Sequence, residues 1–186
     1  MIASRSISFG IGVLALAASL ASFAADAPAA APAPAPGSPG SLASAELISL
    51  ADAMRMAQAA MADCAKRGQP TTVAVVDATG FQRLALSDDN AKLIGVVHTG
   101  RKAAAVLAFK VSSQVLQDRA ASDKSFANQY GKDERYLLQG GALPIYRGDK
   151  LVAVISVGGS GNENDNCAQA GVKAVSWAST APAPHR

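Results

Sequence analysis

The sequence predicts a single α+β domain in which helices pack on an antiparallel sheet. Two observations carry this prediction. β-Branched runs occur in pairs, and a short polar turn joins the members of each pair, which is the pattern of β-hairpins. Helical patterns lie before, between and after these hairpins instead of alternating with single strands, which disfavours a parallel doubly wound sheet.

The first 46 residues precede the expected domain. Arg5 supplies a positive charge, residues 7–20 form an apolar run of about 14 residues, and residues 22–24 make a small-x-small cleavage site. We therefore expect a secretory signal peptide over residues 1–24, with an uncleaved N-terminal anchor as the alternative. The Ala/Pro-rich segment 25–46 favours polyproline II and cannot form a core, so we expect a linker.

The expected domain spans residues 47–179, followed by a flexible tail at 180–186. The chain has a formal charge of +3, and loss of the signal peptide removes one basic residue and no acidic one. The remaining charges are scattered and nearly balanced, so nucleic acid is not an expected partner. No other stretch reaches spanning length, so we expect a periplasmic or secreted protein without stable membrane insertion after cleavage.

The first helix is expected over about residues 50–67. Ser49 followed by Asp52 resembles a capping box, and Gly68 suits the position after a helix. Apolar residues recur at helical spacing. They are Leu50, Ala53, Met54, Ala57, Met61 and Cys64.

The first hairpin is expected over residues 71–76 and 81–86. Residues 77–80 form the turn between these strands. Asp77 is expected to close the turn through its own side chain, with a role at a functional site as the alternative.

A long second helix is expected to follow residues 87–90 and to run to about Lys110. It carries His98, Arg101 and Lys102. A single helical histidine is commonly a surface residue, but it can also be an axial ligand to haem iron. In that alternative, Arg101 or Lys102 would hold the haem propionates.

Two shorter helices are expected at residues 112–119 and 122–130, where they would form the rim of a pocket. The second hairpin follows at residues 142–146 and 151–157. The glycine-rich loop 158–161 lacks the Lys-Ser/Thr pair of a nucleotide-binding P-loop, so we interpret it as a sharp strand-to-helix crossing. Asp165 is expected to cap the last helix.

Cys64 and Cys167 fall near the end of the first helix and the start of the last one. If these helices pack antiparallel the two cysteines meet, and if the helices are parallel they stand about 15–20 Å apart. We hypothesise a disulfide between them, which export would permit. The alternative is a pair of buried thiols.

Several motifs together resemble the GlcG/HbpS-like family of haem-degrading proteins. They are VAVVDATG, the RKA sequence of the long helix, GGALPIYRGDKLVAVISVGGSG, and the aspartate before the last helix. The resemblance covers about residues 47–175. It implies a profilin-like fold, homo-oligomers and, in several members, haem binding.

The sequence departs from the family pattern at two positions. The family has Gly-Val-Ser-Gly where this chain has residues 156–159, and it has an aliphatic residue in place of His98. A threonine commonly follows the middle helix of the family, and Ser113 stands near that place, so Ser113 is a second candidate iron ligand. The candidate haem-binding residues are therefore His98, Arg101, Lys102 and Ser113.

The leading hypothesis is an exported, non-covalent haem-binding protein that serves haem storage, sensing or slow oxidative degradation. No hydrolase triad or paired-carboxylate motif is visible, so we assign no catalytic residue. One alternative is a module that binds a different small molecule, an organic acid or a corrinoid. The other is a purely structural oligomer.

Overall fold

The computed structural model describes residues 47–159 and 161–184. The signal peptide and linker expected over residues 1–46 lie outside the described residues. The elements in chain order are α1 (Leu50–Lys66), β1 (Thr72–Asp77), β2 (Gln82–Ser87), α2 (Ile94–Phe109), α3 (Ser113–Ser122), α4 (Lys124–Tyr130), β3 (Ala142–Arg147), β4 (Lys150–Gly158), the 3-10 turn η2 (Gly161–Glu163) and α5 (Asn164–Lys173). Within this part of the chain, none of the helices has the length and apolarity needed to cross a bilayer.

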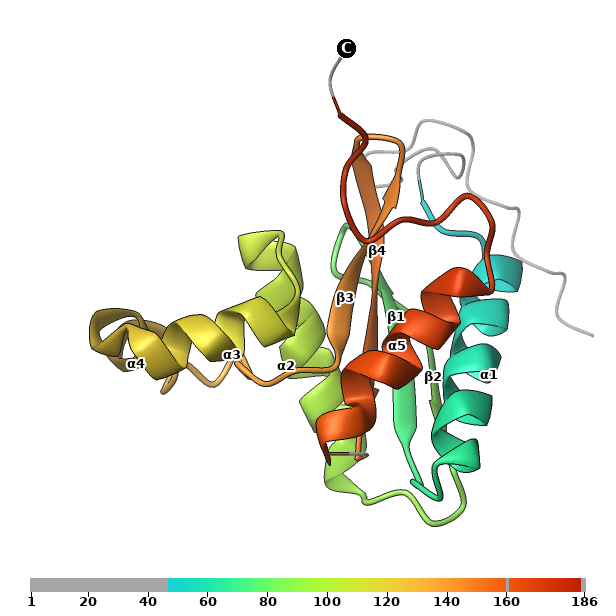
Figure 1. Cartoon of the computed structure of the whole chain (residues 1–186), viewed down its shortest axis with the longest axis horizontal. Coiled ribbons are helices and arrows are strands. Elements are labelled where there is room, and N and C mark those ends of the chain that lie inside the picture. The colour runs from blue at the N-terminus through green and yellow to red at the C-terminus, as the bar shows by residue number, and fades with distance from the viewer. Residues whose placement is uncertain (1–46, 160, 185–186) are drawn as a thin grey trace, which may run out of the picture. The chain divides into compact units, whose positions relative to one another are not determined.

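The four strands form one sheet in the order β2-β1-β4-β3, and all neighbours are antiparallel. β1 and β2 form one hairpin, β3 and β4 form the other, and β1 pairs with β4 to join them (Figure 1). The predicted α+β class is thereby confirmed.

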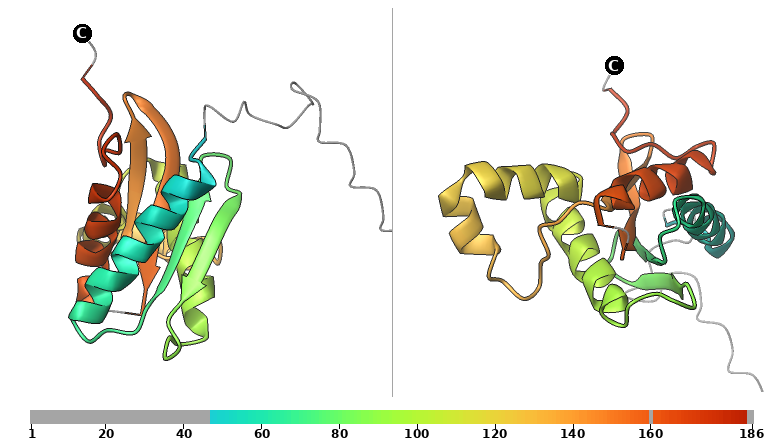
Figure 2. Two further views of the ribbon diagram at one scale, coloured as in Figure 1. Left: turned by 90° about the vertical axis from the view of Figure 1, so that its right-hand side faces the viewer. Right: turned by 60° about the horizontal axis from the view of Figure 1, so that its bottom comes forward.

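Helices cover both faces of the sheet (Figure 2). α1 and α5 pack on one face and α2 packs on the other. Successive strand residues point to opposite faces, so Val75 and Ile155 belong to the α1/α5 core, whereas Val76 and Val154 belong to the smaller core under α2. Both central strands are therefore apolar on both sides, which explains why the TVAVV run lacks alternation.

The structure joins Cys64 and Cys167 by a disulfide, with a Cα–Cα distance of 5.5 Å. This fixes the end of α1 against the start of α5, so the two helices run antiparallel (Figure 1). Gly171 allows their close approach, because a Cβ there would stand 2.7 Å from the Met56 carbonyl oxygen.

α3 and α4 project from the side of the sheet as an arm (Figure 1). The arm has a small core of its own, in which aromatic rings meet edge to face. The rings are those of Phe109, Phe126, Tyr130 and Tyr136. Tyr130 and Tyr136 are therefore part of this aromatic cluster.

Several local expectations can be compared with the structure. Ser49 Oγ accepts a hydrogen bond from Asp52 N, so the predicted cap of α1 is confirmed. Asp77 Oδ1 accepts from the backbone of Thr79, so its turn-closing role is confirmed as well. The apolar stripe of α1 was misassigned in part, because Leu50 is exposed and Met56 is buried in the core.

Candidate functional site

The predicted haem residue His98 lies on a face of α2 that points away from the sheet. Ile94, Val97, His98 and Arg101 follow the i, i+3, i+4, i+7 spacing, so they share one side of the helix. The side chains of Ile94 and Val97 are 48% and 52% exposed, and His98 is half-buried. An apolar surface therefore flanks the imidazole.

Arg101 lies at the C-terminal end of this face and is anchored to the arm. Its Nη2 donates to the Tyr136 carbonyl oxygen at 2.9 Å. Its Nε is buried and has no hydrogen-bond partner among the described residues. The guanidinium group thus keeps donor capacity for a further acceptor.

Lys102 lies one turn after His98, but its side chain reaches into the domain. Its ammonium group is buried and donates to the carbonyl oxygens of Gly140 at 2.7 Å and Val157 at 2.9 Å. Burial lowers the pKa of Lys102 from 10.5 to about 8, and the charge of Asp165 opposes that shift. Since both carbonyl oxygens hold the side chain inside, Lys102 does not share an accessible face with His98.

Ser113 is also fully buried. Its hydroxyl oxygen accepts a hydrogen bond from Ala142 N at 2.8 Å, which ties the start of α3 to the start of β3. This contact gives the hydroxyl a structural role and leaves none of it on the surface. Of the four candidates, the structure brings only His98 and Arg101 to a common outward face.

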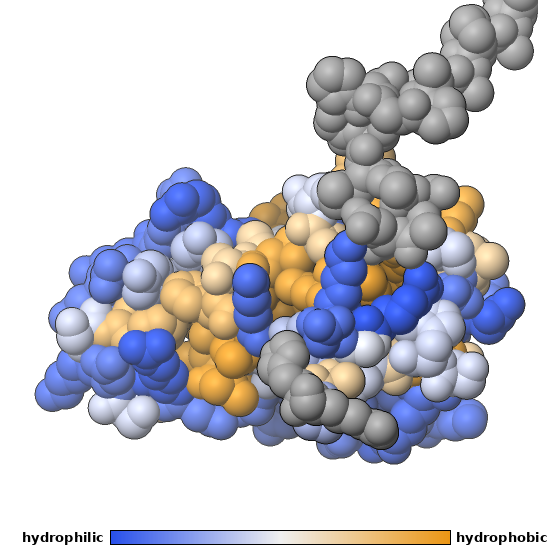
Figure 3. Space-filling view, turned by 90° about the horizontal axis from the view of Figure 1, so that it is seen from above, coloured by the Kyte–Doolittle hydropathy of each residue, from blue (hydrophilic) through white to orange (hydrophobic). Residues whose placement is uncertain are grey.

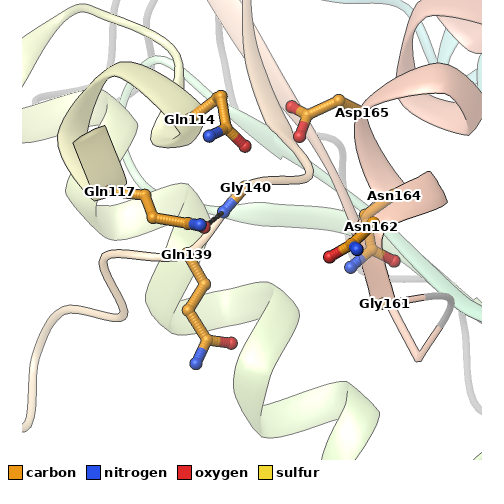
Figure 4. Close-up of a pocket in the computed structure, with 8 residues that line it drawn as sticks. All are labelled: Gln114, Gln117, Gln139, Gly140, Gly161, Asn162, Asn164 and Asp165. Atoms are coloured by element: carbon orange, nitrogen blue, oxygen red, sulfur yellow. Dashed lines mark hydrogen bonds between the residues drawn. The ribbon is translucent and has the colours of Figure 1, made fainter. Parts of the chain in front are cut away.

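A hollow of about 730 Å³ lies elsewhere, between α3 and the start of α5 (Figure 4). Every residue that lines it is an amide, an acid or a glycine. They are Gln114, Gln117, Gln139, Gly140, Gly161, Asn162, Asn164 and Asp165. We call this hollow the amide pocket.

Asp165 does not cap α5, contrary to the prediction. The helix starts one residue earlier at Asn164, and the N-cap position makes no side-chain cap bond. Asp165 Oδ1 instead accepts from Gly141 N at 3.0 Å, because the loop before β3 passes beside the first turn of α5. Burial raises the pKa of Asp165 above its usual 3.8, although the Gly141 hydrogen bond and Lys102 oppose this.

Sequence reasoning did not single out the amide side chains of this pocket. Glutamine and asparagine carry no titratable signature, and the ones here come from α3, a loop and η2, which are distant in sequence. The glycine pair Gly140-Gly141 was the one available signal. Gly141 has φ 112°, and a Cβ on Gly140 would collide with side-chain oxygens of Gln114 and Asp165.

A second hollow is smaller and more apolar. It has a volume of about 350 Å³ and lies where α2 turns into α3, next to β3 and the C-terminal segment. Val111 and Val115 contribute exposed apolar surface there. Seen from above, the molecule shows apolar residues gathered between the arm and the sheet, with polar residues around them (Figure 3).

Solved structures share this fold. PduOC in a haem complex superposes with a TM-score of 0.66 at 21% identity, covering 73% of this chain and 99% of PduOC. A double mutant of Streptomyces reticuli HbpS gives 0.63 at 29% identity, covering 80% and 99%. Klebsiella pneumoniae ORFY gives 0.62 at 22% identity, covering 68% and 89%.

No curated protein sequence matches the chain closely enough to indicate a relationship. The family comparison does give a match, because residues 48–173 match the haem-degrading HbpS-like proteins. That match covers most of the described domain and agrees with the resemblance carried by the second hairpin and its glycine loop. The chain therefore belongs to the HbpS-like family of haem-degrading proteins.

Proposed function

We propose that this chain is an exported protein that binds haem without a covalent link, on the outward face of α2. The observation that carries the proposal is the position of His98. Its half-buried imidazole lies beside the exposed side chains of Ile94 and Val97, with Arg101 one turn further on. Membership of a haem-degrading family supports the proposal.

The chemistry of the two surfaces favours this face over the amide pocket. A porphyrin ring needs an apolar wall, an axial ligand and cations for its propionates. The amide pocket has no apolar side chain in its lining. The α2 face offers aliphatic surface from Ile94 and Val97, an imidazole from His98, and the positive charge of the half-buried Arg101 side chain.

In this proposal the His98 imidazole would coordinate the haem iron, and the Arg101 guanidinium would pair with a propionate. Lys102 and Ser113 act on the scaffold, because their polar atoms already bind the backbone inside the domain. Bound haem would supply the oxidative chemistry, which belongs to the cofactor.

We also propose that the protein is a homo-oligomer. Leu93, at the start of α2, is 93% exposed, and Ile94, Val96 and Val97 continue the apolar surface. A single helix face covers one side of a flat ring, so a second copy would have to enclose the other side. The storage, sensing and degradation roles remain alternatives within this proposal.

Export is proposed from the signal-peptide pattern of residues 1–24. The disulfide between Cys64 and Cys167 supports it, because such bonds persist in oxidising compartments. Cell fractionation of the full-length protein, followed by intact-mass measurement, tests both points. A cytosolic product that still carries residues 1–24 would contradict export.

The test of haem binding is a titration of the purified protein with haemin, followed through the Soret band. We expect a saturable shift in the wild type, and a changed spectrum with at least about tenfold weaker affinity in His98→Ala. His185→Ala is the matched control, because it removes the other histidine of the chain and should leave the spectrum unchanged.

The outcomes separate two conclusions. Failure of the wild type to shift the Soret band at micromolar haemin would overturn haem binding altogether. A His98→Ala spectrum identical to that of the wild type would remove the α2 face from the proposal. The apolar hollow beside Val111 and Val115 would then be the next location to test.

A further inference from the structure

We propose that the amide pocket is a second ligand site, separate from the haem face, which binds a small neutral polyhydroxylated molecule such as a monosaccharide or a polyol. The inference goes beyond haem binding, because it uses different residues and a different ligand chemistry. It rests on the lining of the pocket, on two converging oxygen atoms and on the local balance of charge.

The lining fits hydroxyl groups. The volume of about 730 Å³ is in the range of small-molecule sites, about 300–1,000 Å³. Such sites are usually apolar with a few polar groups, whereas all the side chains here are polar. An amide both donates and accepts hydrogen bonds, and so does a hydroxyl, so a ring of amides matches a ligand with several hydroxyl groups.

Two acceptor atoms converge beside Gly140. The amide nitrogen of Gln114 already donates to Asp118, and Asp165 Oδ1 already accepts from Gly141 N. This leaves Gln114 Oε1 and Asp165 Oδ2, which lie close to the same point next to Gly140 (Figure 4). Among the described residues, neither oxygen accepts a hydrogen bond, so both are free to accept from the hydroxyl groups of a ligand in the hollow.

The charge at this point favours a neutral ligand. The buried Lys102 ammonium lies behind Gly141 and attracts Asp165, so the carboxylate already has a counter-charge. The Asp165 carboxylate at the pocket wall would repel an organic acid. The Lys102 ammonium group would not offset this repulsion, because it stays turned toward the carbonyl oxygens of Gly140 and Val157. A neutral polyol does not meet this repulsion.

The pocket walls are held in place before any ligand arrives. Gly140 N donates to Gln117 Oε1 at 2.7 Å, which ties the loop before β3 to α3. The Asp165–Gly141 hydrogen bond ties the same loop to α5. A fixed site loses less conformational entropy on binding, which suits a ligand that offers only hydrogen bonds.

The experiment is saturation-transfer NMR on the full purified protein, with D-glucose and xylitol as separate probes and lactate as the acidic comparison. We expect saturable transfer from at least one of the two hydroxylated probes and weaker transfer to lactate. Asp165→Asn and Gln114→Leu should each weaken binding at least about tenfold. The Asp165→Asn side chain can still accept from Gly141 N, so this variant should fold.

Gln129→Leu is the matched control, because this exposed glutamine on α4 lies outside the amide pocket. Three results would each overturn the proposal. These are no saturable transfer from either probe up to about 50 mM, stronger binding of lactate, or wild-type affinity in both pocket variants. Haemin titration of Asp165→Asn keeps the two proposals distinguishable, because its Soret shift should equal that of the wild type.

Discussion

The two faces of the sheet are built differently. The α1/α5 side holds a continuous apolar core that is closed by the Cys64–Cys167 disulfide. The α2 side has a smaller apolar cluster and encloses the Lys102 ammonium group. Both buried polar atoms that lack a partner among the described residues, Arg101 Nε and Ser156 Oγ, are also on the α2 side.

This difference separates stability from function. Apolar packing and a cross-link stabilise a fold without placing any chemistry on it. Buried polar groups cost stability unless they are paired, so the two unpaired atoms on the α2 side carry such a cost. The proposed haem face is built from α2 alone, whereas the amide pocket takes residues from α3, the loop before β3, η2 and the first turn of α5.

Loss of the disulfide is expected to have the largest effect and tests the α1/α5 side. The bond joins residues 103 positions apart, so its removal frees a long loop in the unfolded chain. The double variant Cys64→Ala/Cys167→Ala should lose about 2–5 kcal/mol in the free energy of unfolding by urea. Identical urea curves, together with two free thiols in the wild type by mass spectrometry, would contradict the cross-link.

The next prediction concerns Lys102 and tests the α2 side. The pKa of Lys102 is about 8 in the folded protein and 10.5 in the absence of burial. Between these two pH values the Lys102 side chain is therefore protonated in the unfolded chain and largely deprotonated in the folded protein. The free energy of unfolding should therefore rise with pH across this window, by at most about 3 kcal/mol. Urea curves at several pH values measure it. Lys102→Met should lose this pH dependence, and Lys66→Met, at an exposed site, should keep it. If the free energy of unfolding changed equally with pH in all three proteins, the pH dependence would not come from Lys102.

Two glycine substitutions compare the packing of the two sides directly. A Cβ on Gly171 would stand 2.5 Å from Ile155 Cδ1 and 2.7 Å from the Met56 carbonyl oxygen, so Gly171→Ala should cost about 1–3 kcal/mol. A Cβ on Gly100 in α2 meets nothing within 4 Å, so Gly100→Ala should gain up to about 1 kcal/mol through helix propensity. Thermal melts measure both, and a stabilising Gly171→Ala would show that α1 and α5 pack more loosely than described.

The smallest expected effect belongs to Asp165. Burial raises its pKa above 3.8, so its contribution to stability is present below that pH and is lost as the pH rises through the folded-state pKa. Asp165→Asn should therefore be slightly more stable than the wild type at pH 7 and equal to it below pH 3.8. Chemical denaturation at both pH values checks this. A less stable variant at pH 7 would mean that the Asp165–Lys102 attraction outweighs the desolvation.

Most of the fold could be predicted from local signals in the sequence. The Ser49 cap, the Asp77 turn and the two hairpins each depend on residues within a few positions of one another. The errors arose where tertiary contacts override local preference. Asp165 has the residue type of a helix cap, but the Gly140-Gly141 loop occupies its carboxylate.

The candidate site was less predictable for the same reason. His98, Arg101 and Lys102 lie close together in sequence, and their residue types suit a haem site. The sequence does not reveal that Lys102 turns inward to the carbonyl oxygen of Val157, which is 55 positions away. The amide pocket was missed because Gln114 and Asp165 come together only where α3 and the first turn of α5 both lie beside the Gly140-Gly141 loop.

By itself, the sequence determined the α+β class, the hairpins and the family, because these depend on periodicity, turn chemistry and ordered motifs. Only the tertiary structure decided that α1 and α5 run antiparallel, that His98 and Arg101 share a face without Lys102, and that amides gather around Asp165. The physical reason is that burial and hydrogen-bond partners depend on contacts between residues far apart in the chain. A local pattern specifies an element but not its neighbours.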